Sequence, residues 1–185
     1  MRSAIHVFTA AVGLMAAGTA SASSLAAPFG LAPGTATLAD VQRQIGAHTK
    51  LREEGISALL GGKILSGNGA GLKLPELKHV LFVFDTYGVL QIVQLSLPNG
   101  GMGYPEFKQY RSQLSNKYRQ LADSEPFVGE QYARFAASNA VISIDSPELS
   151  FDMDITYLTP IARAAIAHDQ KVKEAQRRAS EAQGL

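Results

Sequence analysis

The sequence predicts an α+β fold built on antiparallel sheet, in which a helix followed by a strand meander occurs twice before a C-terminal helix. Two apolar runs, residues 79–85 and 89–97, flank a tight turn. Apolar residues recur at spacings of three and four after Pro105, and a strict period-two pattern occupies residues 149–157. Hairpin connections between strands favour an antiparallel sheet over a wound parallel one, and the repeated order suggests an old internal duplication.

Residues 1–22 have the pattern of a secretory signal peptide. Arg2 precedes an apolar stretch from Ala4 to Ala17, and a small-x-small site closes the segment. We expect cleavage near Ala22 and Ser23 and a periplasmic mature protein. The stretch is shorter than the ~20 residues that span a bilayer, so no membrane span is expected after cleavage. The remaining chain divides into an α+β domain, 23–160, with possible tandem halves 28–98 and 104–159, and a C-terminal helix or tail, 160–185.

Composition excludes several classes of site. The chain has no cysteine, which rules out disulfides, zinc-thiolate sites and thiol nucleophiles. Of the 17 basic residues only Arg2 lies in the leader, so equal numbers of basic and acidic residues follow it. A neutral mature chain without a basic stripe is not expected to bind nucleic acid.

The first half begins with a predicted strand around Phe29 to Leu31. Thr37 then caps a short helix, with Asp40 in a capping-box position and an apolar face that ends at Gly46. Residues 56–74 indicate one or two weaker strands interrupted by glycine. The runs 79–85 and 89–97 form a hairpin whose turn is bracketed by Asp85 and Gly88. Because both arms are apolar on both faces, we expect a central hairpin that is covered on each side.

The second half begins with the best helical pattern of the chain. From Pro105, one apolar stripe runs through Phe107, Tyr110, Leu114, Tyr118 and Leu121. Three strands are then predicted, at 132–136, 141–145 and 149–157. In the last of these, alternation of apolar residues with Asp152, Asp154 and Thr156 indicates one wet face. A final helix starts at Thr159-Pro160; its early part can pack, and its charged end reaches into solvent.

The glycine-rich stretch SGNGAG could wrap a phosphate, be presented to another protein, or form a plain loop or bulge at a sheet margin. A phosphate loop must feed a helix N-terminus, whereas an extended Leu-Lys-Leu-Pro follows here. The stretch NGGMGYP does lie between a strand and a helix, but Pro105 removes a donor that an anion would need. The residues selected as candidate interaction loops are Ser66, Gly67, Asn68, Gly69, Tyr87, Gly101 and Tyr104.

No catalytic, cofactor-binding or metal-ligating set is predicted. His48, His79 and His168 stand on different elements without metal-ligand spacing. Asp145, Asp152 and Asp154 could bind calcium or act as an acid/base pair, and a solvated strand face explains the same residues. Ser66 lacks a nucleophile motif. We therefore expect a protein that is not an enzyme and uses no cofactor.

Residues 27–46, APFGLAPGTATLADVQRQIG, resemble the start of small envelope modules in which a Gly-led turn precedes a short helix. The match rests on Gly34, Val41 and Gly46. The outer-membrane-assembly lipoproteins (SmpA/OmlA, BamE-like) and the secreted β-lactamase-inhibitor proteins share the helix-then-meander plan. The hairpin from Phe84 to Leu90 also resembles one in secreted proteobacterial proteins of unknown function. The chain departs from the lipoproteins in having no lipidated cysteine. The resemblance implies a protein-binding module without catalysis.

A second resemblance concerns SGNGA, residues 66–70, which is similar to the loop with which periplasmic lysozyme inhibitors plug a glycosidase cleft. The tyrosine that follows that loop is replaced here by Gly71-Leu72. The function predicted from the sequence is a non-catalytic, soluble periplasmic module that binds another envelope or secreted protein, as an accessory factor or inhibitor. The alternative is a small-ligand-binding protein with a pocket between the long helix and the sheet, near residues 99–105.

Overall fold

A computed structural model describes residues 24–100, 105–126, 129–148 and 150–183. The predicted signal segment and the candidate loop residues Gly101 and Tyr104 lie outside the described residues. The elements in chain order are η1 (Pro28–Gly30), α1 (Leu38–Gly46), β1 (Leu51–Ile56), β2 (Gly61–Asn68), β3 (His79–Asp85), β4 (Leu90–Pro98), α2 (Pro105–Ser115), β5 (Arg119–Ser124), β6 (Gln131–Ala136), β7 (Val141–Ser146), β8 (Asp152–Leu158) and α3 (Pro160–Gln183).

All eight strands form one antiparallel sheet, in the order β1-β2-β3-β4-β8-β7-β6-β5. The α+β class with antiparallel sheet and a C-terminal helix is therefore confirmed. β4 and β8 meet at the centre, where Val93 lies opposite Tyr157. Every strand between β2 and β6 thus has two hydrogen-bonded neighbours, and only β1 and β5 are edge strands.

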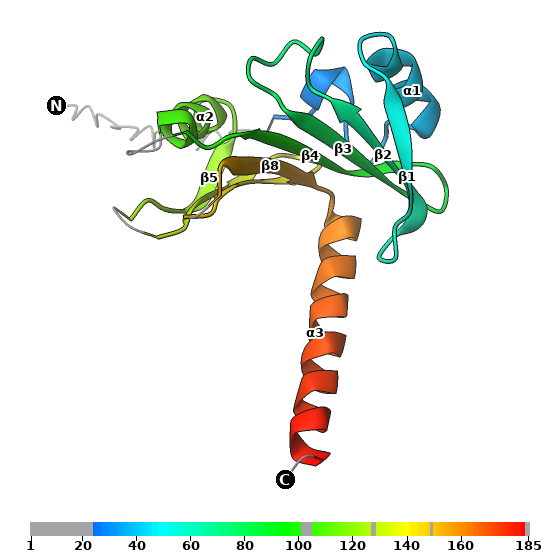
Figure 1. The fold of residues 1–185 in the computed structure, drawn as a ribbon, viewed down its shortest axis with the longest axis vertical. Coiled ribbons are helices and arrows are strands. Elements are labelled where there is room, and N and C mark those ends of the chain that lie inside the picture. The colour runs from blue at the N-terminus through cyan, green and yellow to red at the C-terminus, as the bar shows by residue number, and fades with distance from the viewer. Residues whose placement is uncertain (1–23, 101–104, 127–128, 149, 184–185) are drawn as a thin grey trace, which may run out of the picture.

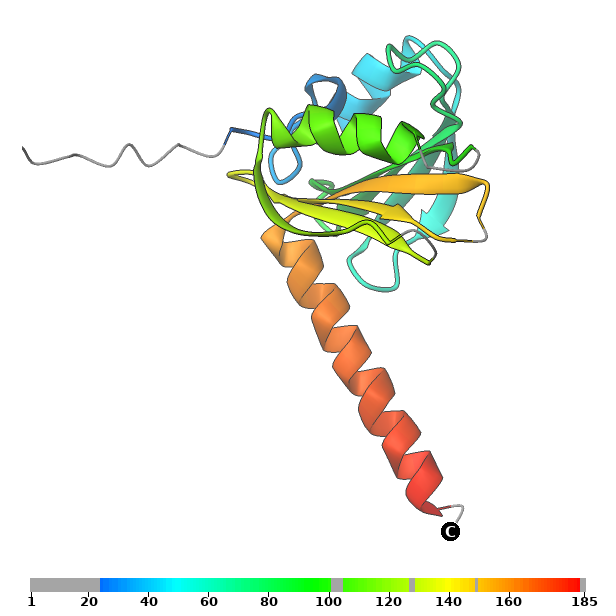
Figure 2. The same ribbon diagram turned by 90° about the vertical axis from the view of Figure 1, so that its left-hand side faces the viewer.

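The helices are distributed unequally over the two faces of this sheet. α1 and α2 lie on the same face, and α3 leaves from the opposite face and extends away from the sheet (Figures 1 and 2). We call the first the covered face and the second the open face. This arrangement leaves most of one sheet face without a helix over it.

The hydrophobic core lies between the covered face and the two helices. Val41 and Ile45 of α1 and Phe107 of α2 are fully buried against alternate residues of the strands. The strand residues in this core include Leu65, Val80, Phe82, Val93, Leu95, Leu97, Phe135, Ile142, Ile144, Met153 and Ile155. Burial of this much apolar surface against two helices is the main source of stability of the fold.

The capping box predicted for the first helix is confirmed. The Asp40 N–H donates to Thr37 Oγ1 over 3.3 Å, and the Thr37 N–H donates to Asp40 Oδ2 over 2.9 Å. These hydrogen bonds lower the pKa of the Asp40 carboxyl below its ordinary value. The cap fixes where α1 begins, which lets Val41 and Ile45 reach the core.

Two predicted elements are wrong. Residues 28–30 form a 3-10 helix and not a strand, because Pro28 starts the turn and Phe29 and Gly30 have positive φ. The long helix ends at Ser115, where the prediction continued it to Leu121. Residues 119–124 instead form β5 and pair with β6, so four strands follow α2 where three were predicted. The apolar stripe continues past Ser115 because Tyr118 also faces the core.

The hairpin of β3 and β4 is central, as predicted, but the prediction that it is covered on each side is wrong. Val80 and Phe82 are buried on the covered face, whereas Leu81 and Ile92 point to the open face and are half-buried. The alternation in β8 is confirmed from Met153 to Tyr157. Phe151 precedes the strand and is 86% exposed, and Leu149 lies outside the described residues.

A buried polar network fixes the start of α3. The Gln91 amide donates to Asp85 Oδ2 over 2.8 Å, and the Thr159 hydroxyl donates to Gln91 Oε1 over 2.5 Å. Thr159 also caps α3, since it accepts the Ala162 N–H over 3.2 Å. The β3–β4 turn is therefore connected through one side chain to the first turn of α3. Among the described helices, none is long and apolar enough to cross a membrane.

Candidate functional site

The open face is made by the strand residues that alternate with the core residues. Antiparallel register places them in rows that run across the strands. The row nearest the base of α3 is aliphatic and comprises Ile64, Val83, Ile92, Leu158 and Val141. The second row comprises Ser66, Leu81, Gln94, Thr156, Ser143 and Arg134. The third comprises Asn68, His79, Ser96, Asp154, Asp145 and Tyr132.

Two hollows occupy this face. The first, of about 590 Å³, is lined from β1 to β4 by polar side chains that include Arg52, Ser66 and His79. The second, of about 620 Å³, is lined from β4 to β5 and by Arg163 and Ile166 of α3. Gln94 lines both, so the hollows adjoin at the centre of the sheet. Together they make a shallow surface that crosses nearly the whole sheet.

The β1 end of the open face carries positive charge. Arg52 lies opposite Ser66 in the register, and Lys50 and His79 line the same hollow. The Ser66 hydroxyl donates to Glu54, so the carboxylate in this hollow already has a partner. Within the described residues, the side chains of Lys50 and Arg52 have no hydrogen bond or ion pair. These two cations are free to contact a ligand or a partner protein.

At the other end, Arg134 is held on the sheet. Its guanidinium donates to Asp145 Oδ1 over 2.6 Å and to the Ile144 carbonyl over 3.1 Å, and lies 5.3 Å from the ring centre of Tyr132. Arg163 lines the same hollow from α3, and its side chain makes no ion pair in the part of the chain that the structure describes. This end therefore offers one fixed and one free cation.

The three aspartates named from the sequence do lie on this face, as the pattern predicted, but each has its own partner. Asp145 pairs with Arg134, Asp154 accepts the Ser96 hydroxyl over 2.6 Å, and Asp152 pairs with Lys78. Among the described residues, no group of three or more histidines and carboxylates could hold a metal ion. A solvated strand face accounts for these residues, and the described residues give no geometric support for a calcium site.

The structure places Ser66, Gly67 and Asn68 in strand β2 between β1 and β3, where the sequence had suggested a loop. Ser66 and Asn68 thereby reach the open face and line the first hollow.

The glycines that follow them are explained by close contacts. A Cβ on Gly69 would lie 1.9 Å from the Leu77 carbonyl oxygen. Gly71 has φ of +96°, which favours glycine. Close packing at Gly69 and the positive φ of Gly71 explain why glycine occupies these positions, without a bound phosphate.

Tyr87, another candidate residue that the structure describes, does not join this site. Tyr87 lies in the β3–β4 turn and is 92% exposed, so it does not fold back onto the sheet. Near the proposed pocket at residues 99–105, Asn99 is buried and its amide donates to the Ser150 carbonyl over 3.0 Å. Asn99 Oδ1 also accepts the Ser146 hydroxyl over 3.0 Å. This side chain holds the loop before β8, and neither hollow of the open face is lined by α2.

Sequence reasoning missed the cations of the open face. Lys50 and Arg52 belong to the first edge strand and its approach, and Arg163 belongs to the last helix, more than 100 residues later. No motif connects them, because only the sheet order and the position of α3 bring them to one face. The polar residues Gln94 and Ser96 within the apolar run of β4 were the available signal for an exposed central strand.

No family model matches the chain, and no curated protein or solved structure is significantly similar to it. The resemblance to BamE-like lipoproteins and to inhibitor modules therefore stays a hypothesis.

Proposed function

We propose that this protein is a non-catalytic, periplasmic protein-binding module that docks another envelope or secreted protein on its open face. The observation that carries the proposal is the hollowed central part of an eight-stranded sheet that α1 and α2 leave uncovered. An antiparallel sheet can keep one face in water, but on this sheet an aliphatic row that includes Ile92 of β4 and Leu158 of β8 lies on the face without helices. A partner protein would complete this missing layer.

The composition of the open face is more typical of a protein interface than of a hydrophobic core that has been left exposed. The half-buried members of its aliphatic row, Ile64, Ile92, Leu158 and Val141, can lose water on docking, whereas Val83 is already buried. The amide, hydroxyl and guanidinium groups of the face can form the polar rim of an interface. Arg134 stacked near Tyr132 supplies the residue types that are enriched among interface hot spots.

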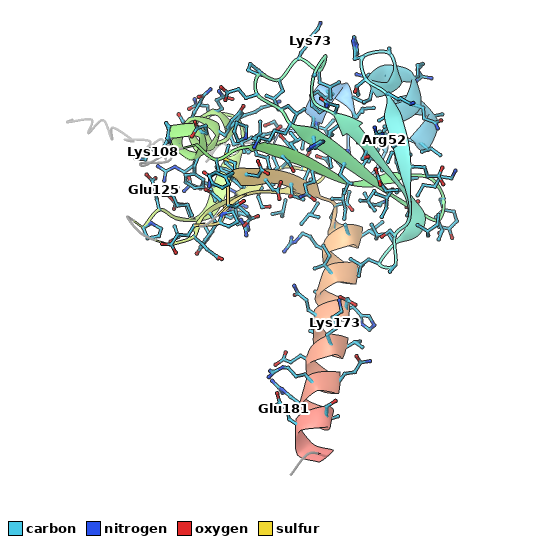
Figure 3. All side chains as sticks on the ribbon, viewed as in Figure 1. Arg52, Lys73, Lys108, Glu125, Lys173 and Glu181 are labelled. Carbon is cyan, nitrogen blue, oxygen red and sulfur yellow. The ribbon has the colours of Figure 1, made fainter. Side chains whose placement is uncertain are left out.

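A crosslinked affinity pull-down of the tagged mature chain from its native envelope fraction tests the proposal. We expect one protein to be enriched above a tag-only control and to be lost with Gln94→Glu, which places a carboxylate where the two hollows meet. The matched control Lys108→Glu changes an exposed residue of α2 on the covered side (Figure 3) and should leave the partner bound. A partner retained by Gln94→Glu would refute docking on the open face.

Small-ligand binding is the second candidate, and the volume of the first hollow favours it. About 590 Å³ falls in the range of ligand pockets, and the lining carries several donors and acceptors. In that case the pull-down should enrich no protein, whereas a ligand should raise the melting temperature of the mature chain. A thermal-shift screen with no stabilising compound, alongside a specific partner in the pull-down, would exclude this candidate.

We infer that the two halves of the domain, 28–98 and the segment from α2 to β8, are copies of one helix-then-meander unit. The element order supports this, since one helix precedes β1 to β4 and another precedes β5 to β8. The halves meet along β4 and β8. Co-expressed fragments 24–100 and 105–183 should reassociate through these strands, and fragments that stay separate would argue against the inference.

The periplasmic location rests on residues 1–22. Expression with the native leader should yield a mature protein that begins near Ser23 and is released by osmotic shock. Intact mass of the released protein checks this, and an unprocessed chain that starts at Met1 in the cytoplasmic fraction would refute the signal peptide.

A further inference from the structure

We propose that the open face binds an acidic segment of its partner protein, whose carboxylates contact Arg52 at the β1 end and Arg163 at the α3 end. This inference rests on the proposed function and adds to it the chemistry of the partner. Three features of the structure support it: the free charges of the open face are positive, the two hollows are continuous, and both sheet edges carry bulges.

The free charges of this face are positive. Its carboxylates already accept hydrogen bonds or ion pairs: Glu54 from Ser66, Asp145 from Arg134 and Asp154 from Ser96. Lys50, Arg52 and Arg163 line the hollows without such partners among the described residues. A docking carboxylate would therefore find unpaired donors at both ends, whereas a docking cation would have to compete with existing hydrogen bonds.

The carboxylates of the face also restrict what kind of anion fits. Glu54 and Asp145 line the two hollows and Asp154 lies on the same face, so a polyanion with a charge at every unit would be repelled along its length. A protein segment can place its acidic residues only where the cations are. Between them, Gln94, Thr156 and Ser143 offer amide and hydroxyl groups that suit a neutral stretch of main chain.

The dimensions suit an extended segment of moderate length. Arg163 belongs to the first turn of α3, which contacts β4 and β8, three to four strand spacings from Arg52 on β1, or about 14–19 Å across the sheet. An extended chain of roughly four to six residues covers this span. Because Gln94 lines both hollows, such a segment could cross the face without leaving it.

The edges of the sheet do not favour the other common way of binding a segment, addition of a strand. β1 has a bulge between Glu53 and Gly55 and three charged residues in sequence. β5 has a bulge between Gln120 and Ala122. Bulges and charges at an edge prevent pairing with another strand. The segment is thus expected to lie on the face and not to extend the sheet.

The test is selection of short random peptides, displayed on phage, on the immobilised mature chain. Selected peptides should be enriched in Asp and Glu relative to the input library, in two groups separated by a neutral stretch. The dissociation constant of a selected peptide, measured by fluorescence anisotropy, should rise at least about tenfold in Arg52→Glu/Arg163→Glu and should also rise with salt.

A matched control carries the same change of charge elsewhere. Lys73→Glu/Lys108→Glu alters two exposed lysines in the loop before β3 and on α2, away from the open face (Figure 3), and should leave the peptide affinity within about twofold. Equal loss of affinity in this control would show that net charge acts and not the open face, and would overturn the inference.

The remaining outcomes separate the inference from the proposed function. Selected peptides that lack acidic enrichment and no longer bind Gln94→Glu would overturn the acidic chemistry and leave docking on the open face intact. Selected peptides that bind all open-face variants equally would refute both. If no peptide is enriched over the bare support, a continuous segment is excluded as the ligand, and the envelope pull-down alone decides the proposed function.

Discussion

The covered and open faces of the sheet are made by alternate residues of the same strands, yet they differ in almost every property. In β3, Phe82 is fully buried beneath the helices, whereas its neighbour Leu81 lines a hollow. In β8, Ile155 is in the core, and Thr156 lies on the open face. The difference teaches that side chains adjacent in sequence contribute very differently to stability, so that the binding proposed for the open face should change independently of the core.

The largest expected effect is on the covered face. Phe82→Ala should lower the free energy of unfolding by about 3–5 kcal/mol, because it leaves a cavity among fully buried side chains. Urea denaturation followed by circular dichroism measures the change. Leu81→Ala is the matched control and should cost less than half as much. Equal losses would break the comparison, since they would mean that the open face is covered as well.

A smaller loss of stability is expected at Gln91, whose hydrogen bonds connect the β3–β4 turn to the start of α3. Gln91→Leu should cost about 1–3 kcal/mol, because Asp85 loses a donor and the Thr159 hydroxyl loses its acceptor. The backbone amide of Ala162 should then exchange hydrogen faster, as the cap of α3 loosens. Gln94→Leu, whose side chain makes no hydrogen bond within the described residues, serves as control. Unchanged protection at Ala162 would show that Gln91 does not hold α3.

The cap of α1 tests the contribution of the helices to the stability of the covered face, because α1 is one of the two helices that pack on it. Thr37→Ala should lower the free energy of unfolding by about 1 kcal/mol through loss of the capping hydroxyl. Asp40 adds a dependence on pH. Its pKa is lowered in the folded protein by the hydrogen bonds from Thr37, so its contribution is present above its ordinary pKa of 3.8. The contribution is lost as the pH falls through the lowered value.

Asp40→Asn should therefore be less stable than the parent protein at neutral pH, and the difference should shrink in acid. Chemical denaturation at several pH values measures both proteins side by side. A difference that stays constant down to the most acidic pH would contradict the role of the ionised carboxylate in the cap.

The smallest effect on stability is predicted on the open face. Thr156→Ala should change the free energy of unfolding by less than about 0.5 kcal/mol, since its side chain lines a hollow and forms no hydrogen bond among the described residues. The same variant should weaken partner binding in the pull-down. A destabilisation above about 1 kcal/mol would instead show that Thr156 is part of the structural core.

Local patterns predicted much of the fold. The capping box of α1, the β3–β4 hairpin and the alternation of Met153, Ile155 and Tyr157 each depend on residues close in sequence, and each is confirmed. Strand β5 was missed because Tyr118 and Leu121 continue the helical spacing of α2 beyond its end. The strand predicted around Phe29 to Leu31 was wrong because Pro28 and Gly30 produce a turn among residues whose pattern otherwise indicates a strand.

The candidate site could be predicted only in part. The wet face of β8 was visible in Asp152, Asp154 and Thr156, but the matching face of β3 and β4 was hidden by Leu81, Val83 and Ile92. Such aliphatic residues ordinarily indicate burial on both sides. Placement of both α1 and α2 on one face is a property of tertiary packing, and the sequence of a single strand does not contain it.

Helix α3 extends well beyond the sheet (Figures 1 and 2). After Val172 every side chain whose exposure is described, up to Glu181, is exposed, and ion pairs one turn apart, such as Lys173 with Asp169, support the helix. At about 1.5 Å per residue, the 24 residues of α3 extend over about 36 Å. The Gln91 network anchors the first turn of the helix, and the length of the helix sets how far its end lies from the sheet. Each inserted residue would lengthen it and rotate its far end by about 100°.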